Sequence, residues 1–307
     1  MTATDVCAVL ITYHPDVEFP VRLSRIAPQV GAIVIVDNGS EQSEVTMLRE
    51  VAADSAVTLV LNSENLGIAR ALNIGIERAT ARGYRFVLLM DQDSRADSDM
   101  VAALLATYES FPGNERLAIV GAGFGEIESH NPNPYAPTEE PWQDAEWVIT
   151  SGTLLPVAAY AAIGPFREEF FIDYVDIDYC IRARANGYRV IKTRRPLMSH
   201  SIGSPKQHRF LWTRKWTSNH SADRRYYIAR NNVIFLREGG RYPLGLWVLK
   251  SFLTCFKSFR RVLLYEQNKT SKCIAVFSGW WDGLRRRMGP RDKRRWPKQA
   301  PASEVRK

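Results

Sequence analysis

Two carboxylates directly follow a buried apolar run in the first third of the chain. Asp91 and Asp93 come after residues 86–90, which read Phe-Val-Leu-Leu-Met. A run of this kind predicts a strand covered on both faces, and sheets built from such strands bind ligands at the carboxyl ends of the strands. Two oxygen ligands at that edge suit Mg²⁺ or Mn²⁺ carrying a diphosphate. A turn that merely ends the strand would use the same residues, so the surrounding pattern has to decide.

Strand-like and helix-like segments alternate through the first 90 residues. Strands are predicted at residues 7–13, 33–36 and 57–61 and in the run ending at Met90, and helices at residues 21–30 and 68–82. This alternation predicts an α/β fold with a mostly parallel central sheet and helices on both faces.

The pattern is less regular after Asp93. A helix is predicted at residues 100–108, and strands at residues 117–120 and 147–152, the last running into a glycine turn. Residues 131–137 contain three prolines and predict a loop, which is either a mobile lid or a surface loop without function.

The net charge of +8 is concentrated at the end of the chain. Residues 241–307 carry 17 Lys and Arg against 4 Asp and Glu, whereas residues 1–240 carry 24 against 29. We therefore predict one catalytic domain over residues 1–240 and a basic tail over residues 241–307 with a disordered end.

Apolar and aromatic residues lie among the basic residues of this tail. Charge interrupts the apolar stretches too often for a membrane-spanning helix. We expect two amphipathic helices, at residues 244–264 and 272–287, that lie on an anionic membrane surface with Trp280 and Trp281 near the headgroups. Packing on the catalytic domain and an oligomer contact are the alternatives. No nucleic-acid-binding module is recognisable, so a nucleic-acid partner is not expected.

The cysteines and the first residues favour a cytoplasmic location. Cys7, Cys180, Cys255 and Cys273 lack the paired spacing of a zinc site or a disulfide framework. The N-terminus has no signal-peptide pattern. With the basic tail, this predicts a peripheral protein at the inner face of the cell membrane.

Several short motifs occur in order along residues 5–240. They are Val36-Asp37-Asn38-Gly39-Ser40, Asn65-Leu66-Gly67, Asn73-Ile74-Gly75, Asp91-Gln92-Asp93, Ser151-Gly152 and Asp176-Ile177-Asp178. As an ordered set they resemble glycosyltransferase family 2, and within it the bacterial rhamnosyltransferases. The resemblance implies a GT-A fold with a Rossmann-like sheet, an inverting mechanism and a nucleotide-sugar donor linked to dTDP or UDP.

The resemblance also implies which residues bind the donor. Thr12, Tyr13 and Asp37 match positions around the nucleobase, where a carboxylate can accept the ring N–H of a pyrimidine. Asp37 would equally serve as a turn former before Asn38 and Gly39.

A second group matches the segment beside the diphosphate. It consists of Asn65, Gly67 and Asn73, with a helix beginning near Ile68 whose free N–H groups suit an anion. Asn65 would alternatively be the N-cap of that helix.

The metal and the catalytic base are assigned in the same way. Asp91, Asp93 and His200 match positions that hold a divalent cation, and Asp91 also belongs to the donor site. Asp176 matches the second acid of the family's Glu-Asp pair and is the expected base, which removes the proton of the acceptor hydroxyl. Val175 stands in the first acid's place, so Asp173 and Asp178 remain rivals. Asp178 with Arg182 also has the spacing of a surface ion pair.

The resemblance therefore implies an inverting, metal-dependent glycosyltransferase. It would move L-rhamnose from dTDP-rhamnose to a polysaccharide or lipid-linked acceptor in the synthesis of a cell-surface glycan such as lipopolysaccharide or cell wall. Val175 favours the alternative, a catalytically inactive sugar-nucleotide binding module recruited to membranes.

Overall fold

A computed structural model describes most of the chain. The described residues are 1–125, 140–199, 206–210, 213–217, 219–238, 259–260 and 262–292. They form two compact units, one of residues 1–168 with 175–201 and one of residues 169–174 with 202–307. The predicted loop at residues 131–137, His200 and nearly all of the predicted helix at residues 244–264 lie outside the described residues.

Four parallel strands form one half of the sheet in the first unit. In spatial order they are β3 (Val57–Leu61), β2 (Ala32–Asp37), β1 (Val6–Thr12) and β4 (Phe86–Asp91). Each of the four strands coincides with an apolar run from which a strand was predicted. Every residue of β1 and β2 is buried. The chain adds β2 and β3 on one side of β1 and then returns to add β4 on the other side. Open α/β sheets bind ligands in the crevice at such a change in strand order.

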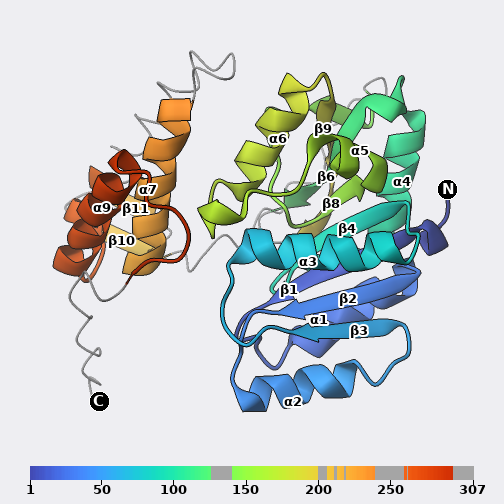
Figure 1. Cartoon of the computed structure of the whole chain (residues 1–307), viewed down its shortest axis with the longest axis horizontal. Helices are drawn as coiled ribbons and strands as arrows, with labels where there is room; N and C mark the ends of the chain where they lie inside the picture. Colours follow the sequence, from blue (N-terminus) through green and yellow to red (C-terminus); the bar gives the residue numbers. More distant parts are fainter. Residues whose placement is uncertain are drawn as a thin grey trace. The chain divides into compact units, whose positions relative to one another are not determined.

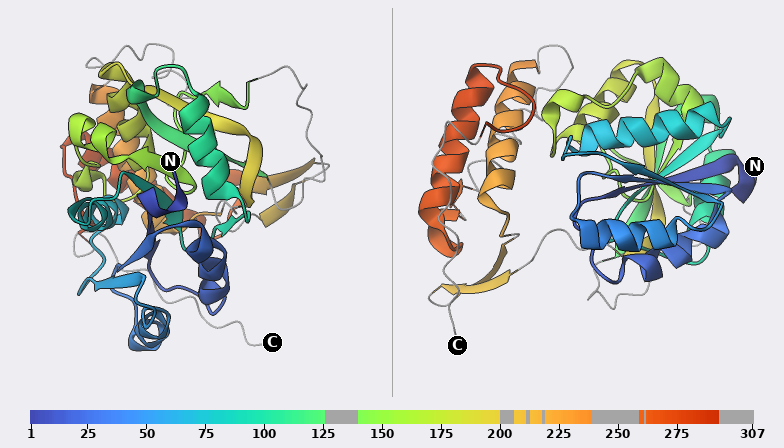
Figure 2. Two further views of the ribbon diagram at one scale, coloured as in Figure 1. Left: turned by 90° about the vertical axis from the view of Figure 1, so that its right-hand side faces the viewer. Right: turned by 60° about the horizontal axis from the view of Figure 1, so that its bottom comes forward.

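Helices cover both faces of this half, as Figure 2 shows. The helices are α1 (Phe19–Ile26), α2 (Gln42–Val51) and α3 (Ile68–Ala81). Val6, Ala8 and Leu10 of β1 point to one core, which contains residues of α1 and α2. Val9 points the other way, toward Gly75 of α3. Because the strands are buried on both sides, their apolar runs are continuous instead of alternating.

The other half of the sheet has mixed direction. From β4 the order continues through β8 (Thr153–Pro156), β6 (Leu117–Gly125), β9 (Arg189–Ser199) and β5 (Arg95–Ala96), and β7 (Trp142–Asp144) also pairs with β9. Of the strand pairs that the structure describes in this half, β6–β9 alone is parallel. The accompanying helices are α4 (Met100–Ser110), α5 (Val157–Ile163) and α6 (Val175–Ala185), all visible in Figure 1. The predicted α/β class is confirmed.

The prediction of a strand at residues 147–152 is wrong. These residues form a loop, and the strand begins at Thr153. Val148 is apolar and buried because it packs from the loop, with its Cγ1 2.9 Å from the position of a Cβ built on Gly121. Gly152 has a φ of +74°, and the Thr153 hydroxyl donates to the Ile149 carbonyl at 2.7 Å. Apolar burial therefore arose here without a strand.

The second unit pairs two helices and a small hairpin. Helix α7 (Ala222–Glu238) packs along α9 (Lys269–Leu284), and β10 (Lys206–Phe210) pairs with β11 (Thr213–Thr217). Gly279 and Gly283 let the helix backbones approach, since a Cβ there would lie 2.4 Å from the Tyr226 carbonyl oxygen and 2.8 Å from that of Arg230. The helix predicted at residues 272–287 is thus present, but it begins and ends one turn earlier. Within the described residues, no helix has the length and apolar character needed to cross a bilayer.

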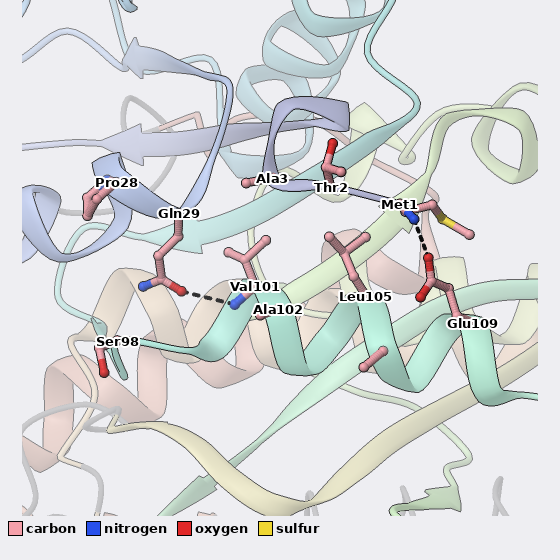
Figure 3. A pocket seen from close by; sticks show the side chains of 11 residues that line it. Met1, Thr2, Ala3, Pro28, Gln29, Ser98, Val101, Ala102, Leu105 and Glu109 are labelled. Atoms are coloured by element: carbon pink, nitrogen blue, oxygen red, sulfur yellow. Dashed lines mark hydrogen bonds and ion pairs between the residues drawn. The ribbon is translucent and has the colours of Figure 1, made fainter.

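A pocket of about 430 Å³ lies where the strands begin, close to the N-terminus (Figure 3). The Met1 ammonium group pairs with Glu109, and the Gln29 side-chain oxygen accepts from the Val101 N–H at 3.1 Å. Met1 to Ala3 precede β1, and Pro28 and Gln29 precede β2. The pocket is therefore at the edge opposite to Asp91 and Asp93.

We predict that Gly75→Ala destabilises the first unit, although alanine is the better helix former. A Cβ at residue 75 would lie 2.3 Å from Val9 Cγ1, and such overpacking costs about 1–3 kcal/mol. Urea denaturation measures the change in the free energy of unfolding. Combining Gly75→Ala with Val9→Ala should cost less than the sum of the two single changes, because the shortened side chain makes room. Strict additivity would contradict the predicted contact.

Candidate functional site

Three strand ends bring polar side chains together at the carboxyl edge of the sheet. Thr12 of β1 is the register partner of Asp37 of β2, and Ile11 is the partner of Asp91 of β4. Thr12, Asp37 and Asp91 thus end adjacent strands, as Figure 1 shows for β1, β2 and β4. The apolar runs determine this arrangement, because each run ends at the same level of the sheet.

Asp37 is almost completely buried, at 1% exposure, and its carboxylate accepts four hydrogen bonds. Oδ1 accepts from the Thr12 hydroxyl at 2.8 Å and from the Ser40 hydroxyl at 2.5 Å. Oδ2 accepts from the Gly39 N–H at 3.1 Å and the Ser40 N–H at 2.9 Å. These bonds use the four lone-pair positions of the carboxylate. Asp37 therefore forms the turn. Its predicted role toward a nucleobase requires that the ring N–H of the base replace one of these four donors.

Gln92 connects the end of β4 to the loop after β1. Its side-chain oxygen accepts from the Tyr13 N–H at 2.8 Å, and its amide donates to the Tyr13 carbonyl at 3.1 Å. The buried Arg22 side chain donates to the Gln92 carbonyl at 2.7 Å. Tyr13 is 46% exposed, and its ring lies against the His14 ring. The Gln92 side chain therefore fixes the loop that presents Tyr13, a role that its place between Asp91 and Asp93 in the sequence did not indicate.

Asp91 and Asp93 differ in exposure. Asp91 is half-buried, and its N–H donates to the Ser151 hydroxyl at 3.1 Å, which lies 2.7 Å from the Ser94 hydroxyl. Asp93 is exposed beyond the strand end. Two carboxylates at an open edge fit Mg²⁺ or Mn²⁺, since these ions take their remaining ligands from diphosphate oxygens and water. Among the described residues, no three His, Cys, Asp or Glu side chains form a metal cluster.

The segment before α3 is organised by Asn65. Its side-chain oxygen accepts from the Gly67 N–H at 2.9 Å, and Gly67, with a φ of +86°, is the N-cap of α3. The alternative that Asn65 itself is the N-cap is therefore wrong. The N-cap Gly67 has no side chain that could cap the first turn of α3, and the N–H groups of this turn point to the same carboxyl edge.

Asn73 lies inside the fold, with 1% exposure. Its amide nitrogen donates to the Phe166 carbonyl and to Glu168, both at 2.9 Å. Its oxygen accepts from the Tyr160 hydroxyl at 2.9 Å and the Phe166 N–H at 3.0 Å. All four hydrogen-bonding positions of this amide are used, so Asn73 attaches α3 to residues 160–168 and has no group directed at a donor.

The three acids considered for the base have different surroundings. Asp178 is 1% exposed and pairs with Arg182 at 2.8 Å and Arg167 at 3.3 Å, so the predicted surface ion pair is a buried one. Burial raises the pKa of the Asp178 carboxyl, and the two arginines offset part of that rise. Asp176 is half-buried in the first turn of α6, and its Oδ1 accepts from the Ile177 N–H at 2.8 Å.

Asp173 belongs to the second unit, in a loop with unusual backbone angles. Phe171, Asp173 and Tyr174 have φ values of +67°, +61° and +67°. Such angles cost about 1–2 kcal/mol for each residue that carries a side chain. The Asp173 carboxylate pairs with Arg224 at 3.1 Å. Burial raises the pKa of Asp173, and Arg224 offsets part of that rise.

Arg230 and Asn231 hold this loop in place. Asn231 is fully buried, and its amide donates to the carbonyls of Phe170, Ile172 and Asp173 at 2.8–3.0 Å. Arg230 is also fully buried and donates to Phe170 at 2.8 Å and to Gly289. The Arg230 guanidinium lies over the rings of Tyr226 and Tyr227, at 5.7 and 5.0 Å. In the sequence, the signal for this arrangement is the pair Arg230-Asn231, which follows Tyr226 and Tyr227 in the same helix.

We predict that Asn231→Ala destabilises the second unit. Three carbonyls would lose a donor in a loop that is already strained, which corresponds to about 2–4 kcal/mol at the usual worth of a buried hydrogen bond. Chemical denaturation followed by tryptophan fluorescence measures the loss. Asn186→Ala, which removes an exposed amide that donates to the Arg182 carbonyl, is the matched control and should cost about 0.5 kcal/mol or less. Equal losses of stability in Asn231→Ala and Asn186→Ala would contradict the conclusion that Asn231 holds the loop in place.

We also predict that His220 makes stability depend on pH. Burial, with Arg224, Arg225 and Lys272 nearby, lowers the pKa of His220 from 6.5 to about 3. Between these values the unfolded chain binds a proton that the folded chain does not, so the free energy of unfolding falls as the pH drops below 6.5. The wild type should lose more stability between pH 7 and pH 5 than His220→Gln, by at most about 2 kcal/mol, and less where solvent screens the partly buried ring. Identical pH dependence would contradict the shifted pKa.

Known proteins resemble this chain in sequence and in structure. The model of the family "Glycosyl transferase family 2" matches residues 24–146. The dTDP-rhamnosyl transferase RfbF of Shigella flexneri is 28% identical over 297 residues, which cover 92% of this chain and 96% of that protein.

Two solved structures share the fold. One is TarS 1–349 of S. aureus, with a TM-score of 0.58 at 13% identity over 92% of this chain and 81% of that one. The other is the mannosyltransferase PcManGT of Pyrobaculum calidifontis in complex with GDP-Man and Mn²⁺, with a TM-score of 0.58 at 14% identity over 92% of this chain and 88% of that one. The ordered motifs, the sheet with its row of polar strand ends and these similarities agree: the chain has the GT-A fold and resembles the family 2 glycosyltransferases.

Proposed function

We propose that the protein transfers L-rhamnose from dTDP-rhamnose to a glycan or lipid-linked acceptor, with inversion at the anomeric carbon. The similarity to a dTDP-rhamnosyl transferase along almost the full length of both chains supports the sugar and the nucleotide. The observation that carries the proposal is the row of Thr12, Asp37 and Asp91 at adjacent strand ends, with Asp93 exposed beside it. The product would enter a cell-surface glycan assembled at the inner face of the cell membrane.

In this proposal the strand ends bind the donor. The exposed Tyr13 ring offers an aromatic face to the pyrimidine, and Gln92 holds the Tyr13 backbone. Thr12 and Asp37 shape the turn beneath the base, and Asn65 orders the backbone before the uncapped first turn of α3, where a diphosphate is favoured. Asn73 acts indirectly, by fixing α3.

Asp91 and Asp93 would hold Mg²⁺ or Mn²⁺ in the working enzyme. The bound ion would supply positive charge to the departing nucleoside diphosphate. Mn²⁺ in the complex of the mannosyltransferase from Pyrobaculum calidifontis supports this requirement by analogy of fold. His200 is proposed as a further ligand on the motif alone.

The transfer itself requires a base. The acceptor oxygen forms a bond to the anomeric carbon, the bond from that carbon to the diphosphate oxygen breaks, and the acceptor proton goes to a carboxylate. We assign this role to Asp176, because Asp178 is buried between Arg167 and Arg182 and Asp173 is paired with Arg224. In this proposal Asp173 and Asp178 stabilise the fold through these ion pairs and take no proton from the acceptor.

The test is a donor screen that measures released nucleoside diphosphate with Mg²⁺ or Mn²⁺. We expect slow hydrolysis of dTDP-rhamnose even without an acceptor, and we expect Asp93→Asn to lower the metal-stimulated rate about 100-fold or more, because a charge-stabilising ligand is lost. Absence of hydrolysis and of transfer with every nucleotide sugar would favour the inactive binding module instead.

Replacing the proposed base separates chemistry from binding. Asp176→Asn should lower transfer about 10²–10⁴-fold while the affinity for dTDP changes little, since the general base contributes to the transition state. Asp54→Asn, in a turn between α2 and β3, is the control and should retain full activity. Wild-type turnover of Asp176→Asn would remove this residue from the base role.

A further inference from the structure

Helix α9 is amphipathic in the reverse sense to a soluble surface helix. The face that is covered carries Lys272, Ser278 and Asp282 together with small residues. The opposite face carries large apolar side chains, with exposed fractions of 37% for Ile274, 55% for Phe277, 48% for Trp281 and 57% for Leu284. Surface helices normally direct their polar residues to water and their apolar residues to the protein.

The four apolar residues form one continuous stripe. Residues 274, 277, 281 and 284 are three or four positions apart and therefore lie on one side of the helix. Helix α7 occupies the other side, which contains Gly279 and Gly283 (Figure 1). Phe277 also contacts Trp280, with ring centroids 5.4 Å apart, so the aromatic surface is wider than one row.

Arginines follow the stripe at the end of α9. Arg285, Arg286 and Arg287 are exposed, and the Arg285 guanidinium lies 4.2 Å from the centre of the Trp281 ring. An arginine stacked on a tryptophan is suited to the boundary between lipid headgroups and acyl chains, where the ring meets hydrocarbon and the cation meets phosphate. The cations are complementary to anionic headgroups and would repel a second basic tail.

We propose that the stripe of Ile274, Phe277, Trp281 and Leu284, with Arg285 and Arg286, docks the protein on an anionic lipid surface. The helix lies in the plane of the surface, with the stripe in the headgroup and acyl boundary. This deepens the proposed membrane association by naming the contact. Its test uses no catalysis, so failure here leaves the transferase proposal intact.

The test is co-sedimentation of the full chain with vesicles of phosphatidylcholine that contain phosphatidylglycerol. We expect the wild type to bind, to be released as salt rises, and to bind pure phosphatidylcholine more weakly. The double change Phe277→Ser with Trp281→Ser should lower the partition coefficient about tenfold or more, since two apolar side chains no longer enter the lipid. Arg285→Glu with Arg286→Glu should weaken binding to anionic vesicles only.

A matched control removes two exposed apolar side chains elsewhere. Val17→Ser with Val21→Ser changes residues that are 85% and 54% exposed in the first unit, and this variant should sediment like the wild type. Wild-type protein that stays in the supernatant would overturn the proposal, as would equal binding by the serine variants of α9 and of residues 17 and 21. A dimer in light scattering that Phe277→Ser with Trp281→Ser dissociates, without vesicle binding, would assign the stripe to a second copy.

Discussion

The buried carboxylate of Asp37 is the interaction on which the carboxyl edge of the sheet depends. A charge removed from water is tolerated only where donors replace the water, and here Thr12, Gly39 and Ser40 supply four hydrogen bonds. Because Thr12 ends β1 and Asp37 ends β2, satisfying this charge also holds two strand ends in register. Gln92 then extends the arrangement to β4 through the Tyr13 backbone. The strand end that carries Asp91 and Asp93 is therefore linked by hydrogen bonds to the ends of β1 and β2, which is the kind of support that a functional site requires.

The second unit shows the same principle in a different form. Arg230 and Asn231 are fully buried, and they are tolerated because backbone carbonyls of residues 169–173 need donors. Those carbonyls are available because the loop has positive φ angles at three residues with side chains. Polar groups and glycines thus occupy the interior between α7 and α9, where apolar side chains are usual. The large apolar residues of α9 are consequently on its outer side, where a surface helix normally carries polar residues.

How much of this could be predicted from the sequence depends on the kind of interaction. Strands β1 to β4 and helix α3 were predicted within a residue or two, because long apolar runs and a helical period report burial directly. Residues 147–152 were predicted incorrectly because a loop can bury Val148 as well as a strand can. The spacing of Asp178 and Arg182 indicated their pairing but not its burial, which depends on Arg167 and on the packing of α6. Gln92 and Asn73 bind backbone groups that only the folded chain brings near, so no local pattern could reveal their partners.

The most direct measurement is a crystal structure of the protein grown with dTDP and Mn²⁺, with anomalous data collected at the manganese edge. The account predicts an anomalous peak bonded to Asp93, a diphosphate beside it, and the pyrimidine against Tyr13 at the ends of β1 and β2. A nucleotide bound elsewhere, for instance in the pocket between Met1 and Glu109, with no peak at Asp91 or Asp93, would contradict it.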